Sequence, residues 1–222
     1  MNDFEKRLMD SWDSNSHAWT ESIRKEKIES RNKVTNPAIF HEVLAHSPQR
    51  VLDIGCGEGW LARKLAQEGI QVVGIDGSKT LIEEASKAGG GTFKTLTYEA
   101  FATDPAQLES KFDVVLCNFS LLSEDIQPVL KAAREVLAEN GTVIIQTLHP
   151  ITVIQNEPYE NGWKIENFDG MGERYVSSMP WYYRTLGSWI NEFNYAGLNI
   201  VDCKEPINEV GVPLSILFSL KR

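Results

Sequence analysis

The sequence predicts an α/β protein, in which a mostly parallel, doubly wound sheet carries helices on both faces. Three observations support this fold class. From residue 50 onward, short apolar stretches alternate with segments of helical periodicity. A glycine-rich turn at 55–59 joins the first apolar stretch to the first of these helical segments. Two further apolar stretches, 199–204 and 214–220, flank a connection with Pro and Gly, which predicts an antiparallel strand pair that closes the sheet.

Length and composition restrict the classes of protein to consider. With 222 residues, 42% of them hydrophobic and 24% charged, the chain suits one globular domain, 1–222. A net charge of -9 without any long cluster of Lys or Arg argues against nucleic acid as a partner. The sequence shows no run of roughly 18 apolar residues and no secretory signal, so we expect neither membrane insertion nor secretion.

The cysteines bear on location and on metal binding. Cys56, Cys117 and Cys203 are odd in number and lie in or beside predicted strands, so we expect reduced thiols in a cytoplasmic protein. Neither the Cys nor the His residues have the ligand spacing of a zinc site, and no metal is predicted. The sequence leaves the oligomeric state open.

Residues 1–46 are polar and helical in tendency, with Trp12 and Trp19 interspersed. Two interpretations of these tryptophans remain open. They pack an amphipathic helix onto the domain, or they belong to an N-terminal helical lid over a bound ligand. At the end of this segment, Asn36-Pro37 is typical of an N-cap followed by proline at the first helical position, which predicts a helix over 37–45.

The remaining elements follow from apolar periodicity and turn residues. The predicted strands are 50–54, 71–75, 92–97, 112–117 and 142–148, and the predicted helices are 60–68, 79–87, 126–138 and 185–195. Asn140-Gly141 is expected to end the third of these helices in a left-handed conformation. Between 150 and 184 the periodicity disappears, and eight of the chain's twelve Trp and Tyr residues lie between 159 and 195. A stretch this long without regular structure inside a compact domain is usually functional or partly ordered by its own contacts.

The glycine-rich turn restricts the ligand. The dinucleotide fingerprint needs Gly or Ala three residues after its second glycine, but Trp60 stands there. The carboxylate of Asp53, two residues before Gly55, would repel a pyrophosphate and attract a cation. The turn therefore predicts a nucleoside ligand that is positively charged and lacks phosphate, and it disfavours a nicotinamide-dependent oxidoreductase.

The segment Asp53-Ile-Gly-Cys-Gly-Glu-Gly59 resembles motif I of the class I S-adenosylmethionine-dependent methyltransferases, in the small-molecule branch that includes the ubiquinone- and menaquinone-type enzymes. The resemblance extends over 50–149 and, in outline, over the terminal strand pair. It implies a Rossmann-like, seven-stranded sheet with an antiparallel last strand. It also implies S-adenosyl-L-methionine as cofactor and in-line methyl transfer to oxygen, nitrogen or carbon of a small-molecule acceptor.

The resemblance also implies where the cofactor binds, at the carboxyl ends of the strands. Asp76 would take the ribose hydroxyls, the stretch 98–100 the adenine, and Asn118 the methionine moiety. Alternatives remain for each: Asp76 as the N-cap of the next helix, 98–100 as a solvated turn, and Phe119 as plain core. The predicted cofactor-binding residues are Asp53, Gly55, Cys56, Gly57, Trp60, Asp76, Gly77, Ser78, Tyr98, Glu99, Ala100, Asn118 and Phe119.

The acceptor is expected to bind the aromatic insertion 150–184, which follows the fifth strand. The candidates are Trp163, Trp181, Tyr182 and Arg184, and the alternative is a packed aromatic lid that does not touch the substrate. His149, at the end of the fifth strand, is the candidate general base, although a structural loop histidine fits equally well. A protein of this fold that binds the cofactor as a sensor or scaffold, without catalysis, is the alternative function.

Overall fold

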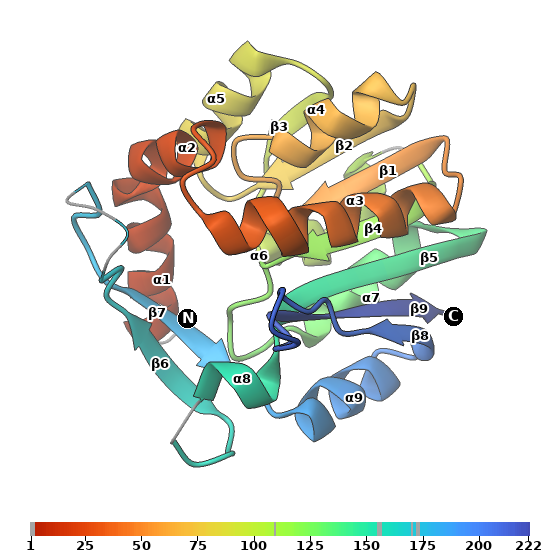
Figure 1. Ribbon diagram of the computed structural model, residues 1–222. Helices are drawn as coiled ribbons and strands as arrows, with labels where there is room; N and C mark the ends of the chain where they lie inside the picture. Colours follow the sequence, from red (N-terminus) through yellow and green to blue (C-terminus); the bar gives the residue numbers. More distant parts are fainter. Residues whose placement is uncertain (1–2, 109, 155–156, 170, 172–173) are drawn as a thin grey trace.

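The computed structural model describes residues 3–108, 110–154, 157–169, 171 and 174–222. A seven-stranded sheet crosses the molecule in the order β3-β2-β1-β4-β5-β9-β8 (Figure 1). The first five strands in sequence are parallel, and β9 runs antiparallel to both of its neighbours. The strands are β1 Arg50–Ile54, β2 Gln71–Asp76, β3 Thr92–Thr95, β4 Phe112–Asn118, β5 Leu137–Leu148, β8 Asn199–Lys204 and β9 Ser215–Lys221. The predicted seven-stranded sheet with an antiparallel last strand is therefore confirmed.

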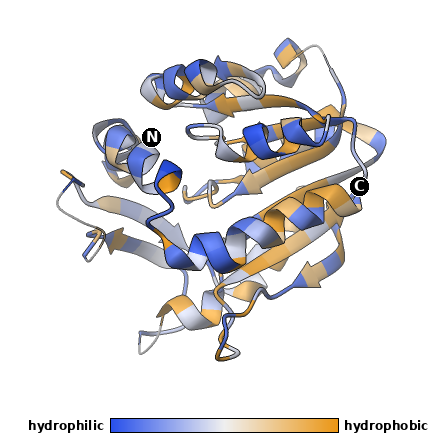
Figure 2. Cartoon of the chain, turned by 45° about the horizontal axis from the view of Figure 1, so that its top comes forward, coloured by the Kyte–Doolittle hydropathy of each residue, from blue (hydrophilic) through white to orange (hydrophobic). Residues whose placement is uncertain are grey.

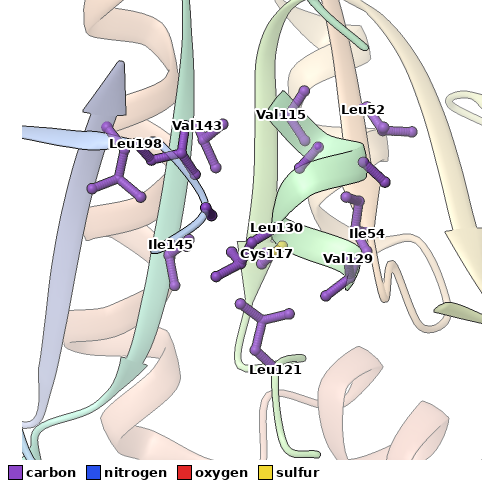
Figure 3. Close-up of a cluster of buried hydrophobic side chains, with 14 of the residues drawn as sticks. Leu52, Ile54, Val115, Cys117, Leu121, Val129, Leu130, Val143, Ile145 and Leu198 are labelled. Atoms are coloured by element: carbon purple, nitrogen blue, oxygen red, sulfur yellow. The ribbon is translucent and has the colours of Figure 1, made fainter. Parts of the chain in front are cut away.

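Helices cover both faces of this sheet because successive strand residues point to opposite sides. Val51 contributes to a hydrophobic cluster with α3 (Asn36–Ala45) and α4 (Trp60–Gln67). The next residue, Leu52, belongs to the opposite cluster, together with α7 (Gln127–Val136) and α9 (Leu186–Tyr195). Figure 3 shows this second cluster, in which Leu52, Val115 and Val143 come from three neighbouring strands. The hydropathy colouring of Figure 2 likewise places hydrophobic residues mainly along the central strands.

Two helices begin at a hydroxyl side chain that accepts a hydrogen bond from the first turn. Ser78 caps α5 (Lys79–Ala88), with its Oγ accepting a hydrogen bond from the backbone N–H of Leu81. Thr97 caps α6 (Tyr98–Thr103) in the same way, accepting from the backbone N–H of Ala100.

Among the described residues, no helix is long and apolar enough to cross a bilayer.

Two predicted helix boundaries are wrong. The helix predicted over 126–138 ends at Val136, because buried Leu137 already pairs with Phe112 of β4. Gly141 therefore lies within β5 and has no left-handed φ. A side chain at Gly141 would lie 3.0 Å from the carbonyl oxygen of Asp113, so close packing explains this glycine.

Asn36 is likewise not an N-cap. A π-helical turn, Arg31–Thr35, leads directly into α3, and Thr35 before it has a right-handed helical conformation. Pro37 stays acceptable because the first turn of a helix does not need its N–H.

The two regions outside the alternating pattern meet at one end of the molecule. The helices α1 (Asp3–Ser14) and α2 (Ser16–Arg24) form the N-terminal region, and α1 contacts strand β7 of a separate hairpin (Figure 1). This hairpin pairs β6 (Gly162–Glu166) with β7 (Met179–Tyr183). It lies inside 150–184, where no regular element is predicted from the sequence, as does α8 (Pro150–Ile154). Residues 155, 156, 170, 172 and 173 of that insertion lie outside the described residues.

Candidate active site

A cavity of about 950 Å³ lies at the carboxyl ends of the parallel strands. This is near the upper end of the roughly 300–1,000 Å³ typical of small-molecule sites. Residues directly after β1, β2, β3 and β4 form one part of its wall, as the carboxyl-end rule predicts. The other part comes from α1, α2, β7 and the segments beside them.

The glycine-rich turn has the shape that its sequence predicts. Gly55, Gly57 and Gly59 all have a left-handed φ, at 74°, 55° and 78°. A side chain on Gly55 would lie 2.4 Å from Cβ of Ser120, so the turn also needs glycine to approach the segment after β4. The backbone N–H groups of Gly55 and Cys56 donate to the carbonyl oxygen of Ile75, at 2.8 and 3.1 Å. The turn is therefore fixed against β2.

Asp76 is held by two backbone N–H groups, one in the glycine-rich turn and one directly before α5. Its Oδ2 accepts a hydrogen bond from the N–H of Gly57 at 2.9 Å, and its Oδ1 accepts one from Ser78 at 2.8 Å. Burial raises the pKa of Asp76, against the lowering effect of these two hydrogen bonds. Because Ser78 is the N-cap of α5, the alternative that Asp76 caps this helix is wrong. Asp76 lines the cavity with its neighbours Gly77 and Ser78.

Asp53 is a buried carboxyl group without a full set of partners. Asp53 is only 3% exposed, and its Oδ1 has no hydrogen-bond partner among the described residues. Burial, with the nearby charge of Asp76, raises the pKa of Asp53 to about 7. An ionised carboxylate in such a place needs a cation for compensation. Asp53 lines the cavity, so a cationic ligand there would supply that compensation.

The segment after β3 agrees only partly with prediction. Tyr98 and Glu99 line the cavity, but Ala100 is absent from its described lining. The N–H of Ala100 donates to Oγ1 of Thr97 at 3.2 Å as part of the helix cap, and so it is not free for an adenine. The hydroxyl of Tyr98 donates to the carbonyl oxygen of Ser120 at 2.8 Å, and burial raises its pKa well above the usual value.

The segment after β4 is bent into the cavity wall. Phe119 has a left-handed φ of 55°, unusual for an aromatic residue, and its N–H donates to the carbonyl oxygen of Gln146 at 2.8 Å. Oδ1 of Asn118 accepts from Nε2 of the same glutamine at 3.0 Å. Both Asn118 and Phe119 line the cavity, and so do Cys56, Gly57 and Trp60 of the predicted cofactor set.

The N-terminal helices cover the cavity and are tied to the glycine-rich turn. Trp12 and Trp19 line the cavity and also pack against each other, with ring centroids 5.4 Å apart. Nε of Arg24, the last residue of α2, lies 2.8 Å from a carboxylate oxygen of Glu58 in the turn. Glu58 is 1% exposed and also binds Arg63. The tryptophans therefore pack the N-terminal helices together and also line the cavity, and the lid over a bound ligand stays a prediction.

Asn15 ties the same helices to the aromatic insertion. It is fully buried between α1 and α2, and its Nδ2 donates to the carbonyl oxygen of Ser177 at 2.7 Å. Its Oδ1 accepts from the N–H of Val176 at 2.8 Å. Asn15 is 162 positions from Ser177 and 161 positions from Val176 in the sequence. These hydrogen bonds therefore join the N-terminal helices to the aromatic insertion.

Arg31 is a functional candidate that the sequence did not single out. It lies in the π-helical turn before α3, lines the cavity, and stands 5.7 Å from the centroid of the Phe119 ring. The only side-chain hydrogen bond of Arg31 among the described residues is a long one, 3.5 Å from Nε to Oδ1 of Asn36. Burial lowers the pKa of Arg31 to about 10, so it is still charged at neutral pH. Nothing in its local sequence marks it, because its place at the cavity depends on the fold.

Three of the four predicted acceptor residues, Trp181, Tyr182 and Arg184, line the cavity. Trp163 does not appear in its described lining; its ring stacks on Phe4 of α1 instead, at 5.0 Å. Trp163 lies on β6, whereas the other three lie on or directly after β7, the hairpin strand that contacts α1. The sequence could not distinguish the two strands because it did not show the hairpin. Further apolar lining residues are Leu121, Leu122, Phe168, Met171, Met179 and Trp189.

His149 is not placed as a general base. It is 5% exposed, its Nε2 lies 2.7 Å from a carboxylate oxygen of Glu205, and the described lining of the cavity does not include it. The chain turns away after Leu148, which does line the cavity, and His149 points toward the connection between β8 and β9. The geometry gives no support to the predicted catalytic role and agrees with the structural alternative.

Known proteins resemble this chain in sequence and fold. Residues 51–141 match the family model of a methyltransferase domain. A ubiquinone biosynthesis O-methyltransferase of Pelagibacter ubique is 34% identical over 102 residues, which are 45% of this chain and 42% of that protein. The corresponding enzyme of Bradyrhizobium diazoefficiens is 29% identical over 65% of this chain and 52% of its own length. The chain thus spans about half the length of these relatives.

Solved structures extend the likeness over the whole fold. Magnesium protoporphyrin IX methyltransferase from Synechocystis PCC 6803, with bound SAH, has a TM-score of 0.67 at 19% identity and covers 98% of this chain and 99% of its own. An S-adenosylmethionine-dependent methyltransferase from Mesorhizobium loti has a TM-score of 0.61 at 21% identity, over 82% and 96%. The sheet order and these structural likenesses show that the chain has the fold of S-adenosylmethionine-dependent methyltransferases, and residues 51–141, which include the glycine-rich turn, match the methyltransferase domain.

Proposed function

We propose that this chain transfers the methyl group of S-adenosylmethionine to a small-molecule acceptor with an apolar, aromatic body. The observation that carries the proposal is Asp53, a buried carboxyl group with an unpartnered oxygen beside a left-handed glycine turn. It opens onto a cavity of about 950 Å³, which is large for one small ligand. A cationic cofactor without phosphate fits this end, and space remains for an acceptor.

The residues that would hold the cofactor have charges opposite to, or hydrogen-bonding groups complementary to, the groups of the cofactor that they would face. Asp53 would face the positively charged part of the methionine moiety. Asp76, fixed by Gly57 and Ser78, would accept hydrogen bonds from the ribose hydroxyls. Arg31 would pair with the cofactor's carboxylate, since it has no ion-pair partner of its own among the described residues.

When bound, the cofactor supplies a methyl group that its sulfonium has already activated. The chain's own residues then have to hold the acceptor in line and exclude water, and positioning of this kind contributes roughly 7–11 kcal/mol in favourable cases. Trp12 and Trp19 from the N-terminal helices, with Trp181 and Tyr182 from β7, enclose the acceptor end. Their apolar surfaces favour an aromatic or similarly flat acceptor, whose reacting atom is oxygen, nitrogen or carbon.

Calorimetric titration with S-adenosylhomocysteine tests the cofactor assignment, and we expect a single site with a micromolar dissociation constant. If S-adenosylhomocysteine does not bind even at millimolar concentration, the proposal is wrong. Transfer of labelled methyl groups to a panel of small aromatic acceptors tests the activity. Tight cofactor binding without turnover on any acceptor would instead favour the non-catalytic sensor or scaffold function.

A further inference from the structure

Two guanidinium groups line the cavity, those of Arg31 and Arg184. Within the described part of the chain, neither forms an ion pair with a carboxylate. Arg184 is the more deeply buried, at 2% exposure, and it lies directly after β7 at the acceptor end. A buried charge that forms no direct ion pair is costly, so its retention calls for an explanation.

The contacts of Arg184 leave half of its guanidinium unused. Nη2 donates to the carbonyl oxygens of Ser123 and Glu124, at 2.6 and 2.5 Å. Nη1 is buried and has no hydrogen-bond partner among the described residues. The guanidinium lies 4.9 Å from the ring centroid of Tyr182 and 5.3 Å from that of Trp189. One nitrogen thus anchors the segment after β4, while the other has two N–H donors that no described residue accepts from.

The nearby carboxylates do not fill this vacancy because they are bound elsewhere. Oε2 of Glu192 accepts from Nε2 of Gln127 at 2.6 Å, and Oδ1 of Asp125 accepts from the N–H of the same residue at 3.1 Å. Oε2 of Glu124 accepts from Nε1 of Trp163 at 3.4 Å. These acids favour the charged form of Arg184, although burial still lowers its pKa to about 10. The group remains a cation at neutral pH.

The cofactor cannot satisfy both arginines, since it has a single carboxylate, which the proposed function gives to Arg31. We propose that the acceptor carries a carboxylate group, which Arg184 receives through Nη1 while the aromatic body of the acceptor packs against Trp181, Tyr182 and Trp189. This inference rests on the proposed function, because it assigns the acceptor end of the same cavity. It makes Arg184 a specificity-determining residue for aromatic acids.

The test measures binding at the acceptor end while S-adenosylhomocysteine saturates the cofactor end. Trp12, Trp19, Trp181 and Trp189 line the cavity, so quenching of tryptophan fluorescence reports occupancy. The probes are matched pairs of an aromatic acid and its neutral amide, namely 4-hydroxyphenylacetate with 4-hydroxyphenylacetamide and cinnamate with cinnamamide. We expect the wild-type protein to bind the acid of each pair at least about tenfold more tightly than the amide, as a charge-assisted hydrogen bond to a buried cation should give.

Variants assign the preference to Arg184. In Arg184→Gln we expect the acid and the amide to bind equally, with an unchanged affinity for S-adenosylhomocysteine. Arg184→Lys, which keeps a cation, should retain part of the preference. Arg174→Gln removes an exposed arginine of the same insertion and should leave the preference as in the wild type.

The outcomes separate this inference from the proposed function. Equal affinity of the wild-type protein for acids and amides would overturn the inference, and this result does not depend on whether any variant folds. A preference that persists in Arg184→Gln would also overturn it. Failure of S-adenosylhomocysteine to bind at all would instead overturn the proposed function.

Discussion

The unpartnered carboxyl group of Asp53 gives the sharpest prediction, because its charge is unfavourable in the free protein and favourable beside a cationic ligand. Its pKa is raised from 3.8 to about 7 by burial and by Asp76. A raised pKa of an acid means that the folded state holds its proton more tightly than the unfolded state does. The free protein therefore loses stability as the pH rises from the unfolded-state pKa to the folded-state pKa.

The size of this effect follows from the two pKa values. A pKa difference of about 3 corresponds to up to about 4 kcal/mol, because each pKa unit is worth about 1.4 kcal/mol. About half of this, or about 2 kcal/mol, accumulates between about pH 5.5 and about pH 8, since the lower pH lies midway between the two values. Asp53→Asn removes the titrating group but keeps the shape. The free energy of unfolding of the variant, relative to the wild type, should increase by about 2 kcal/mol between these two pH values.

Urea unfolding of both proteins at the two pH values measures this difference. Comparing the proteins at the same pH cancels the contribution of the titrating groups that do not interact with Asp53. The same variant should bind S-adenosylmethionine at least about tenfold more weakly at the higher pH, because the cation loses the unpartnered carboxylate of Asp53. A difference in stability that is equal at both pH values would refute the assignment of Asp53 as a buried, uncompensated acid.

Three further predictions concern the turn and its cover. Asp76→Ala should weaken S-adenosylhomocysteine binding by more than about 1 kcal/mol in calorimetry, and an unchanged dissociation constant would remove Asp76 from the site. Gly55→Ala should abolish cofactor binding, because the new methyl group would meet Ser120; stopped-flow or equilibrium binding at wild-type level would contradict this. Arg24→Gln should speed cofactor release several-fold in stopped-flow fluorescence by breaking the ion pair of α2 with Glu58, and an unchanged release rate would show that the N-terminal helices do not restrain the ligand.

The part of the cavity that we propose for the cofactor is lined by residues that the sequence singled out, because they are encoded locally. Asp53, the three glycines and Asp76 follow strands whose apolar runs are plain in the sequence, and parallel strands bring their carboxyl ends to one edge. The predicted roles of Ala100 and His149 are not supported, because each residue already has a hydrogen-bond partner. The N–H of Ala100 donates to the cap of α6, and a carboxylate oxygen of Glu205 binds the ring of His149. Neither partner is visible as such in the sequence.

The acceptor end could not be predicted in the same way because it is assembled from distant segments. Trp163 and Trp181 look alike in sequence, and only their pairing in the β6–β7 hairpin directs one to α1 and the other to the cavity. Arg31 became a candidate only once the fold set it over Phe119 without a carboxylate partner.

Taken by itself, the sequence determined the sheet, the glycine-rich turn and the kind of cofactor, since each depends on residues that are close together in the chain or repeat with a regular period. The tertiary structure decided which aromatic side chains line the cavity and which buried polar groups have no partner among the described residues. Those properties depend on burial and on contacts such as that of Asn15 with Ser177, 162 positions away in the chain. Such contacts form only when the insertion and the N-terminal helices close over the carboxyl ends of the strands, and no local pattern encodes them.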